Sequence, residues 1–393
     1  MSSLSEFDDI RPYNDDEVGP TLKRLMADTE FLDAVIKLRK PSLGRLGVRL
    51  LRPLARRAIA SEFQGVNTVF EFQKRLEKYM REMFENTETE LTVSGLEHLE
   101  KGKAYCFISN HRDIAMDPGC VNWTLYQNGF QTLRIAIGDN LLTKPFASDL
   151  MRLNKCFIVN RSATAPREKL QAAKKLSNYI NHSVSFDNAN IWIAQREGRA
   201  KDGIDKTNSA IIRMLTMARP KEQSFGEFIA ESNFVPVSIS YEWDPCDVAK
   251  ANELTTLERQ GSYEKGDQED VRSIAMGIAG KKGRVHLAFG QPLGADFDNP
   301  DQVVEVLDRS VLENYVLQPT NCVAYEMIEK KTPCVPVTAS GLDFRDYDAT
   351  RERVLMQKRV EACPPENREM LLRIYANPVY SKLKLKELAN ETS

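Results

Sequence analysis

Between residues 91 and 290, short apolar stretches alternate with segments in which apolar residues recur every three or four positions. Strands that alternate with helices in this way are typical of an α/β fold, in which a mostly parallel sheet is flanked by helices. The pattern predicts strands at residues 104–109, 133–137, 156–160, 190–194, 234–240 and 284–289. It predicts helices between them at residues 119–128, 143–153, 166–182, 207–218 and 268–281.

The segments on either side of this central part read as helical, with apolar residues at helical spacing and several charged faces. A chain of 393 residues is long enough to bury a large core in one or two domains. We therefore predict three regions: a helical N-terminal region over 1–90, an α/β domain over 91–300 and a helical C-terminal cap over 301–393.

Charge and cysteine content exclude several classes of protein. Lys and Arg total 54 against 56 Asp and Glu, so the net charge gives no indication of nucleic-acid binding. Seven cysteines without a CxxC pair favour a reducing cytoplasm over a disulfide framework. The N-terminus is acidic and lacks the apolar core of a signal peptide. No apolar run approaches the ~20 residues of a membrane span, so contact with a bilayer would be at its surface.

Four polar residues follow predicted strands within a few positions: His111, Arg161, Arg199 and Glu242. In open α/β sheets, ligands bind in the crevice at the carboxyl ends of the strands. This placement suggests that the four side chains share one site.

The histidine lies in the segment N-H-R-D-I-A-M-D-P at residues 110–118, directly after an apolar run. Such a histidine suits a general base, because the imidazole accepts a proton while a nearby carboxylate fixes its tautomer. Asp117 is one candidate for that carboxylate, and Asp113 competes with it. At a helix start Asp113 is equally suited to capping backbone amides. The alternative for His111, with Asn110 beside it, is a structural histidine at a strand end.

Three common catalytic patterns are excluded. The letters His-Arg-Asp at 111–113 also occur in the catalytic loop of protein kinases, but the asparagine required after them would fall at Pro118. The chain also has no kinase Gly-rich loop, and its Leu-Asp-Phe-Arg at 342–345 is not DFG. No serine lies in a GxSxG elbow, and no HExxH spacing predicts a metal site.

Two further segments carry cations suited to an anion. Arg161 follows a predicted strand, and its planar guanidinium can bind a phosphate through two hydrogen bonds. Gly198 follows another strand and allows close backbone approach, while Arg199 and Lys201 can neutralise an anion. The alternatives are a surface arginine and a polar turn with solvated charges.

Together these segments resemble the glycerophospholipid acyltransferases, the family of glycerol-3-phosphate and 1-acylglycerol-3-phosphate O-acyltransferases. The resemblance covers about residues 91–290. The family's blocks match, in order, the lead-in at 93–99, the Asn-His segment at 110–118, Arg161, Gly198-Arg199 and Val-Pro-Val at 235–237.

The chain departs from the family pattern at two places. His111 and Asp117 are separated by one residue more than in that pattern, which leaves open whether Asp113 or Asp117 orients the ring. Glu197-Gly198 directly precedes Arg199, without the intervening residue of the usual form, so Glu197 is an uncertain site residue.

The resemblance implies single-displacement acyl transfer in phospholipid biosynthesis. His111 would take the proton of an acceptor hydroxyl while Asp117 holds the ring, and Arg161, Arg199 and Lys201 would hold the acceptor phosphate. The donor would be acyl-CoA or acyl-carrier protein, the acceptor a glycerol phosphate, and neither a further cofactor nor a metal is expected. Two alternatives stay open: a non-catalytic lipid or acyl-CoA binding protein on the same fold, and an acyltransferase for another lipid acceptor.

Residues 43–59 form a basic amphipathic segment. Its helical wheel gathers Arg45, Arg49, Arg52 and Arg56 within an arc of about 60°, opposite Leu43, Leu46, Leu50 and Leu54. This pattern is typical of a helix that lies on an anionic bilayer. The alternative is a helix packed on the domain, which Pro53 would kink or split. We expect a cytoplasmic protein that binds the cytoplasmic face of the membrane through this segment.

Overall fold

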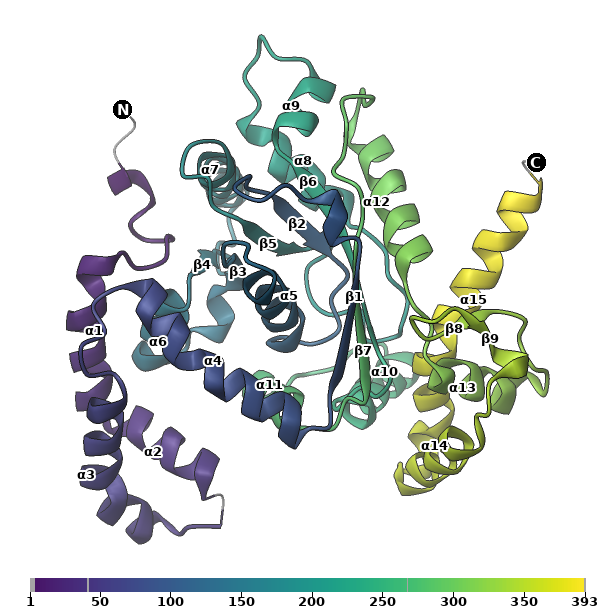
Figure 1. Ribbon diagram of the computed structural model, residues 1–393, viewed down its shortest axis with the longest axis horizontal. Coiled ribbons are helices and arrows are strands. Elements are labelled where there is room, and N and C mark those ends of the chain that lie inside the picture. The colour runs from purple at the N-terminus through teal and green to yellow at the C-terminus, as the bar shows by residue number, and fades with distance from the viewer. Residues whose placement is uncertain (1–3, 41, 267, 392–393) are drawn as a thin grey trace. The chain divides into compact units, whose positions relative to one another are not determined.

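The computed structural model describes residues 4–40, 42–266 and 268–391 (Figure 1). The chain divides into two compact units. The first comprises Met1–Glu82 and Leu133–Tyr179, and the second comprises Met83–Thr132 and Ile180–Ser393. This division cuts across the three regions predicted along the sequence, whose assignment as domains stays a prediction.

The second unit is built on a sheet that is mostly parallel. Its described strands are β1 (Glu90–Ser94), β2 (Cys106–Ser109), β5 (Ile191–Ala194), β6 (Phe234–Tyr241) and β7 (Arg284–Phe289). They lie in the order β1-β7-β6-β2-β5. β2 is parallel to both β5 and β6, and β1 is parallel to β7, whereas β6 and β7 are antiparallel. The carboxyl ends of β2, β5 and β6 therefore meet at one edge, where the polar segments predicted from the sequence follow.

Helices surround this sheet, as the α/β prediction requires. Those of the second unit are α5 (Met116–Gln127), α8 (Ser209–Leu215), α9 (Phe225–Glu231), α10 (Asp247–Gln260), α11 (Glu269–Ala279), α12 (Pro300–Asn314), α13 (Pro319–Glu329), α14 (Thr350–Ala362) and α15 (Arg368–Glu391). Two longer helices, α4 (Val69–Asn86) and α7 (Pro166–Ser185), run from one unit into the other. β2 and β6 are buried along their whole length, as expected of strands covered on both faces. The predicted fold class is confirmed.

The C-terminal helices have a core of their own. Phe344, Met356 and Leu371 are fully buried in a cluster formed mainly by α13, α14 and α15. These helices gather at the right of Figure 1 with the short antiparallel pair β8 (Pro336–Val337) and β9 (Leu342–Asp343). The helical C-terminal extension is thus confirmed, and a small hairpin lies between α13 and α14.

The first unit is helical around a short parallel strand pair. Its elements are α1 (Asp15–Ala27), α2 (Thr29–Arg39), α3 (Arg45–Glu62), β3 (Arg134–Gly138), α6 (Pro145–Leu153) and β4 (Cys156–Val159). The Asp28 carboxylate caps α2 by accepting hydrogen bonds from the backbone amides of Glu30 and Phe31. α3 continues through Pro53 as one helix, so the expected split does not occur. Within the described ranges, no helix has the length and apolar content to cross a bilayer.

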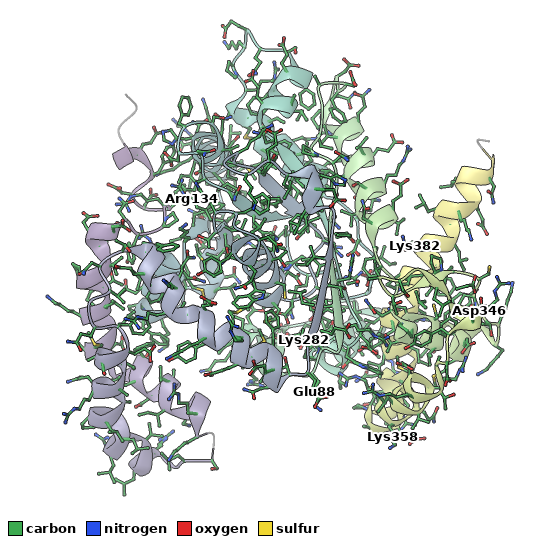
Figure 2. The ribbon with its side chains drawn as sticks, in the orientation of Figure 1. Glu88, Arg134, Lys282, Asp346, Lys358 and Lys382 are labelled. Carbon is green, nitrogen blue, oxygen red and sulfur yellow. The ribbon has the colours of Figure 1, made fainter. Side chains whose placement is uncertain are left out.

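A buried lysine fixes the end of α11 in the second unit. The Nζ of Lys282, labelled in Figure 2, lies 2.9 Å from the Gly280 carbonyl oxygen and 3.5 Å from that of Ile278. A cation at this position is favourable because the last carbonyls of a helix carry partial negative charge. Burial lowers the pKa of Lys282. Its donors nevertheless satisfy carbonyl oxygens at the end of α11.

A buried histidine links β1 to β7 and should make the stability of the protein depend on pH. The ring nitrogens of His286 lie 2.8 Å from the Thr92 hydroxyl and 3.0 Å from the Ser94 hydroxyl. Burial lowers the pKa of His286 below its ordinary value of 6.5. Below that value the unfolded chain binds a proton that the folded protein does not, so acid favours unfolding.

We therefore expect the free energy of unfolding to decrease as the pH falls from about 7 towards 5. His286→Gln should flatten this part of the profile, since it removes the titrating group. Urea denaturation at a series of pH values measures both slopes. An H286Q profile as steep as that of the wild type would assign the dependence to other groups.

Candidate active site

The turn after β2 places His111 against Asp117. The Nδ1 of His111 lies 2.8 Å from Oδ2 of Asp117, and the Asp117 side chain is fully buried. Because a carboxylate only accepts hydrogen bonds, Nδ1 donates and Nε2 carries the lone pair. The His111 side chain keeps 13% of its surface exposed, so the ring is not sealed in the core. This is the arrangement of a general base.

Three other donors hold the Asp117 carboxylate. The backbone amides of Arg112 and Asp113 lie 2.5 and 2.9 Å from Oδ2, and the hydroxyl of Tyr241 lies 2.6 Å from Oδ1. Asp117 belongs to the first turn of α5, where the helix dipole also favours a negative charge. The additional residue between His111 and Asp117 is accommodated because the loop folds its amides around the carboxylate.

Asp113 has a different task. Its Oδ1 accepts hydrogen bonds from the amides of Ala115 (2.9 Å) and Met116 (2.8 Å), which caps the start of α5. Gly277 of α11 packs directly on this carboxyl, since a Cβ there would lie 2.1 Å from the Asp113 Oδ2. Burial, with the charge of Asp117, raises the pKa of Asp113. Of the two candidate carboxylates, Asp117 contacts the ring and Asp113 serves the backbone.

Asn110 joins β2 to β6 at the level of the site. Its Oδ1 accepts a hydrogen bond from the Ile239 amide (2.7 Å), and its Nδ2 donates to the Ile239 carbonyl (3.0 Å). Nδ2 also lies 3.0 Å from Oδ2 of Asp205. Asn110 is buried and fully used by these contacts. It therefore positions the residue that follows it, His111.

Tyr241 was missed by sequence reasoning, which predicted a strand over 234–240 and singled out only Glu242 after it. Tyr241 is the last residue of β6, and burial raises its pKa well above the ordinary value, so it remains a neutral hydrogen-bond donor. One signal could have found it. A tyrosine at the carboxyl end of a strand parallel to β2 lies at the same sheet edge as His111.

The segment after β5 lies against the His111 backbone. The amide of Ala200 donates to the carbonyl oxygen of His111 at 2.7 Å. The neighbouring Arg199 is partly buried, with its Nη2 3.4 Å from the Ser273 hydroxyl. Gly198 has a φ of +73°, a conformation that favours glycine, and a Cβ there would meet nothing within 4 Å. The structure thus brings the Gly-Arg segment and the histidine together.

The other predicted cations have partners of their own. Lys201 forms an ion pair with Glu253, so its charge is compensated. Arg161 lies in the first unit, where Asp139 accepts hydrogen bonds from its backbone amide and from that of Ser162, each at 3.1 Å. Since His111 belongs to the second unit, the place of Arg161 in a phosphate site stays a prediction.

Glu242 and Glu197 are two acidic residues that follow predicted strands near the expected site. Glu242 is bound by Arg284, whose Nη2 and Nε lie 2.7 and 3.1 Å from its two oxygens. It therefore belongs to a buried ion-pair network instead of the shared site expected from its position after a strand. Glu197 is exposed beside Gly198, and its role stays a prediction.

Comparison with known proteins gives a family match for the part of the chain that contains this site. A family model described as Acyltransferase matches residues 90–240, the stretch that contains His111, Asp117 and Arg199. The chain therefore carries an acyltransferase domain over these residues. The family resemblance stated from the sequence is confirmed, and the enzyme class with it. Among curated proteins, none matches this acyltransferase.

Solved structures match as well. The 1-acyl-sn-glycerophosphate (LPA) acyltransferase PlsC from Thermotoga maritima is 16% identical over 74% of this chain and 94% of its own, with a TM-score of 0.38.

We expect Tyr241→Phe to slow acyl transfer about ten- to a hundredfold, because an unsatisfied buried oxygen costs roughly 1–3 kcal/mol and Asp117 would orient His111 less well. The rate of thiol release from acyl-CoA measures the effect.

Tyr13→Phe is the control. Tyr13 is partly buried and also donates to a carboxylate, that of Asp149, at 2.6 Å, but it lies in the first unit. Both variants should lose some stability in thermal unfolding, and only Y241F should lose turnover. Equal turnover in the two variants would contradict a positioning role for Tyr241.

Proposed function

We propose that the protein is an O-acyltransferase that moves a fatty acyl group from acyl-CoA or acyl-carrier protein to glycerol-3-phosphate or 1-acylglycerol-3-phosphate in phospholipid biosynthesis. The observation that carries this proposal is the hydrogen bond between His111 and Asp117 beside the Gly198–Arg199 segment. The family match supports the acyl transfer. The identities of the acyl donor and of the acceptor are part of our proposal.

In the proposed reaction, His111 acts as the base. Its Nε2 takes the proton of the acceptor hydroxyl while that oxygen attacks the thioester carbonyl carbon, and Asp117 stabilises the imidazolium that forms. The tetrahedral intermediate then collapses, the carbon–sulfur bond breaks, and the leaving thiolate takes the proton back from Nε2. Both substrates are held together during the single displacement, which can lower the barrier by about 7 kcal/mol or more when orientation is good.

Arg199 is our first choice for the acceptor phosphate. It follows a glycine in open space and precedes the residue that is hydrogen-bonded to the His111 carbonyl. Its guanidinium can bind two phosphate oxygens at once. Lys201 would join only by exchanging Glu253 for the phosphate, and Arg161 stays a predicted phosphate ligand.

His111→Ala should lower the rate of acyl transfer by roughly 10²–10⁴-fold, the usual contribution of a general base. The assay follows thiol release from acyl-CoA with glycerol-3-phosphate, with 1-acylglycerol-3-phosphate or with phosphate-free monoacylglycerol as acceptor. His98→Gln is the control, because His98 contacts the Phe289 carbonyl at 3.0 Å and lies outside the site. A folded H111A protein with normal turnover would refute the mechanism. Turnover with monoacylglycerol alone would refute the acceptor class.

We further propose that the enzyme binds the cytoplasmic face of the membrane through α3. Leu46, Leu50 and Leu54 recur every four residues along this helix and are 73%, 73% and 65% exposed. An exposed apolar row of this kind fits the interface of a bilayer. Arg52 does not serve it as the helical wheel suggested, because it is bound by Asp33 of α2 at 2.7 Å.

Replacing Leu46, Leu50 and Leu54 together by Gln should lower binding to vesicles of phosphatidylglycerol and phosphatidylcholine at least about a hundredfold, since each buried leucine contributes up to roughly 1.5–3 kcal/mol. Co-sedimentation with vesicles measures the binding. The matched control replaces three exposed leucines elsewhere, Leu170, Leu257 and Leu342. Unchanged binding by the α3 variant, or equal losses in both, would contradict this surface.

A further inference from the structure

The side chain next to the proposed base is directed inward and carries a buried charge. Arg112 is 8% exposed, and its Nη2 lies 2.6 Å from Oδ2 of Asp205 and 3.1 Å from the Gly203 carbonyl oxygen. Its guanidinium carbon lies 5.6 Å from the centre of the Tyr315 ring. A surface location would be usual for an arginine in a polar loop, so this burial needs a reason.

Stability of the fold is a weak reason. Taking two charges out of water costs several kcal/mol for each ion, in order of magnitude, and the attraction between them repays this only with complete hydrogen bonding. Here the pairing is incomplete. Nε of Arg112 and Oδ1 of Asp205 have no hydrogen-bond partner among the described residues. Neutral side chains of similar volume would serve a core at least as well.

The pair instead connects two parts of the site. Arg112 belongs to the segment 110–113, which carries His111, and Asp205 ends the segment 198–205, which carries Arg199. Four contacts join these segments: the ion pair itself, the hydrogen bonds from Arg112 to Gly203 and from Asn110 to Asp205, and the one from the Ala200 amide to the His111 carbonyl. These contacts hold the segment 198–205 against the segment 110–113 near both of its ends.

The backbone of Arg112 is fixed as firmly as its side chain. Its amide donates to Asp117, and its carbonyl oxygen accepts a hydrogen bond from the buried Nζ of Lys250 at 2.7 Å. Lys250 in turn forms an ion pair with Asp244. A change at the Arg112–Asp205 pair would thus be transmitted to the carboxylate that orients His111.

The C-terminal helices hold the other end of the connection. Gly203 has a φ of +82°, and a Cβ there would lie 2.2 Å from the Ile374 carbonyl oxygen of α15. The side-chain amide of Asn377, one turn further along α15, donates to the Asp202 carbonyl at 2.7 Å. The turn at 202–203 is therefore seated on α15, and Asp205 leaves it in a fixed direction.

We propose that the buried Arg112–Asp205 pair positions the base His111 relative to the anion-binding segment 198–205, and so sets the distance between the reacting hydroxyl and the phosphate of the acceptor. The inference rests on the proposed function, in which one segment supplies the base and the other holds the phosphate. Neither Arg112 nor Asp205 touches the reacting atoms. Both are positioning residues, supported from behind by α15.

The decisive variant replaces both charges, Arg112→Met with Asp205→Asn. Asp205→Asn alone would leave a buried arginine unpaired, at a cost of about 3–5 kcal/mol, and could fail to fold. The double variant is neutral, and its Asn keeps an acceptor for the side chain of Asn110. We expect a melting temperature close to that of the wild type, while kcat with a phosphate-bearing acceptor falls about a hundredfold, as expected for a misplacement of about 1 Å.

A second readout does not need turnover. The chain has four histidines, so the imidazole nitrogen resonances can be assigned by single substitutions, that of His111 by its loss in H111A. In the double variant we expect the resonances and the titration curve of His111 to change, and those of His98, His182 and His286 to stay. If the wild type transfers no acyl group to any acceptor, the proposed function fails, and the His111 resonances alone decide this inference.

Glu352→Gln is the matched control. Glu352 is 4% exposed and lies 2.9 Å from Arg284, so the change also neutralises a buried carboxylate paired with an arginine, but outside both segments. It should lower the melting temperature and leave kcat and the His111 resonances unchanged. A folded double variant with wild-type His111 resonances, or with wild-type kcat in an active enzyme, would overturn the proposal. The same His111 shift in E352Q would reduce it to a general effect on the fold.

Discussion

The carboxylate of Asp117 is the constraint on which the site depends. A buried charge is tolerated only when its oxygens are hydrogen-bonded, and this one accepts from a histidine ring, two backbone amides and a tyrosine hydroxyl. Satisfying it requires the loop after β2 to curl over the first turn of α5 and β6 to end at Tyr241. The hydrogen bonds that stabilise this buried carboxylate therefore also fix the orientation of the His111 ring before a substrate binds.

Further buried ionisable side chains lie around this carboxylate. Asp113 caps α5 under Gly277, Lys250 holds the Arg112 carbonyl, and the Arg112–Asp205 pair reaches to the turn beneath α15. Each is a poor choice for stability alone, because desolvation opposes it. Together they connect the site to the C-terminal helices, because the turn at 202–203 packs against α15.

The prediction of the fold succeeded where periodicity along the chain is sufficient. Six of the described strands were predicted within two residues of their ends, because strands covered on both faces are short apolar runs. β1 was missed, since at Glu90–Ser94 its apolar and polar residues are mixed at the edge of the sheet. α5 begins at Met116 instead of 119 because Asp113 caps it. The amino-acid composition of β7 does not indicate that this strand runs antiparallel to β6.

The sequence by itself determined the α/β class, the chemistry of the segment at 110–118 and the cationic character of the segment after Gly198, because these depend on residue type and local spacing. Only the tertiary structure decided between Asp117 and Asp113, found Tyr241, and gave Lys201 and Arg112 their carboxylate partners. The reason is distance along the chain. Partners of these side chains lie some 50 to 124 residues away, and their proximity arises only when the sheet brings strand ends together.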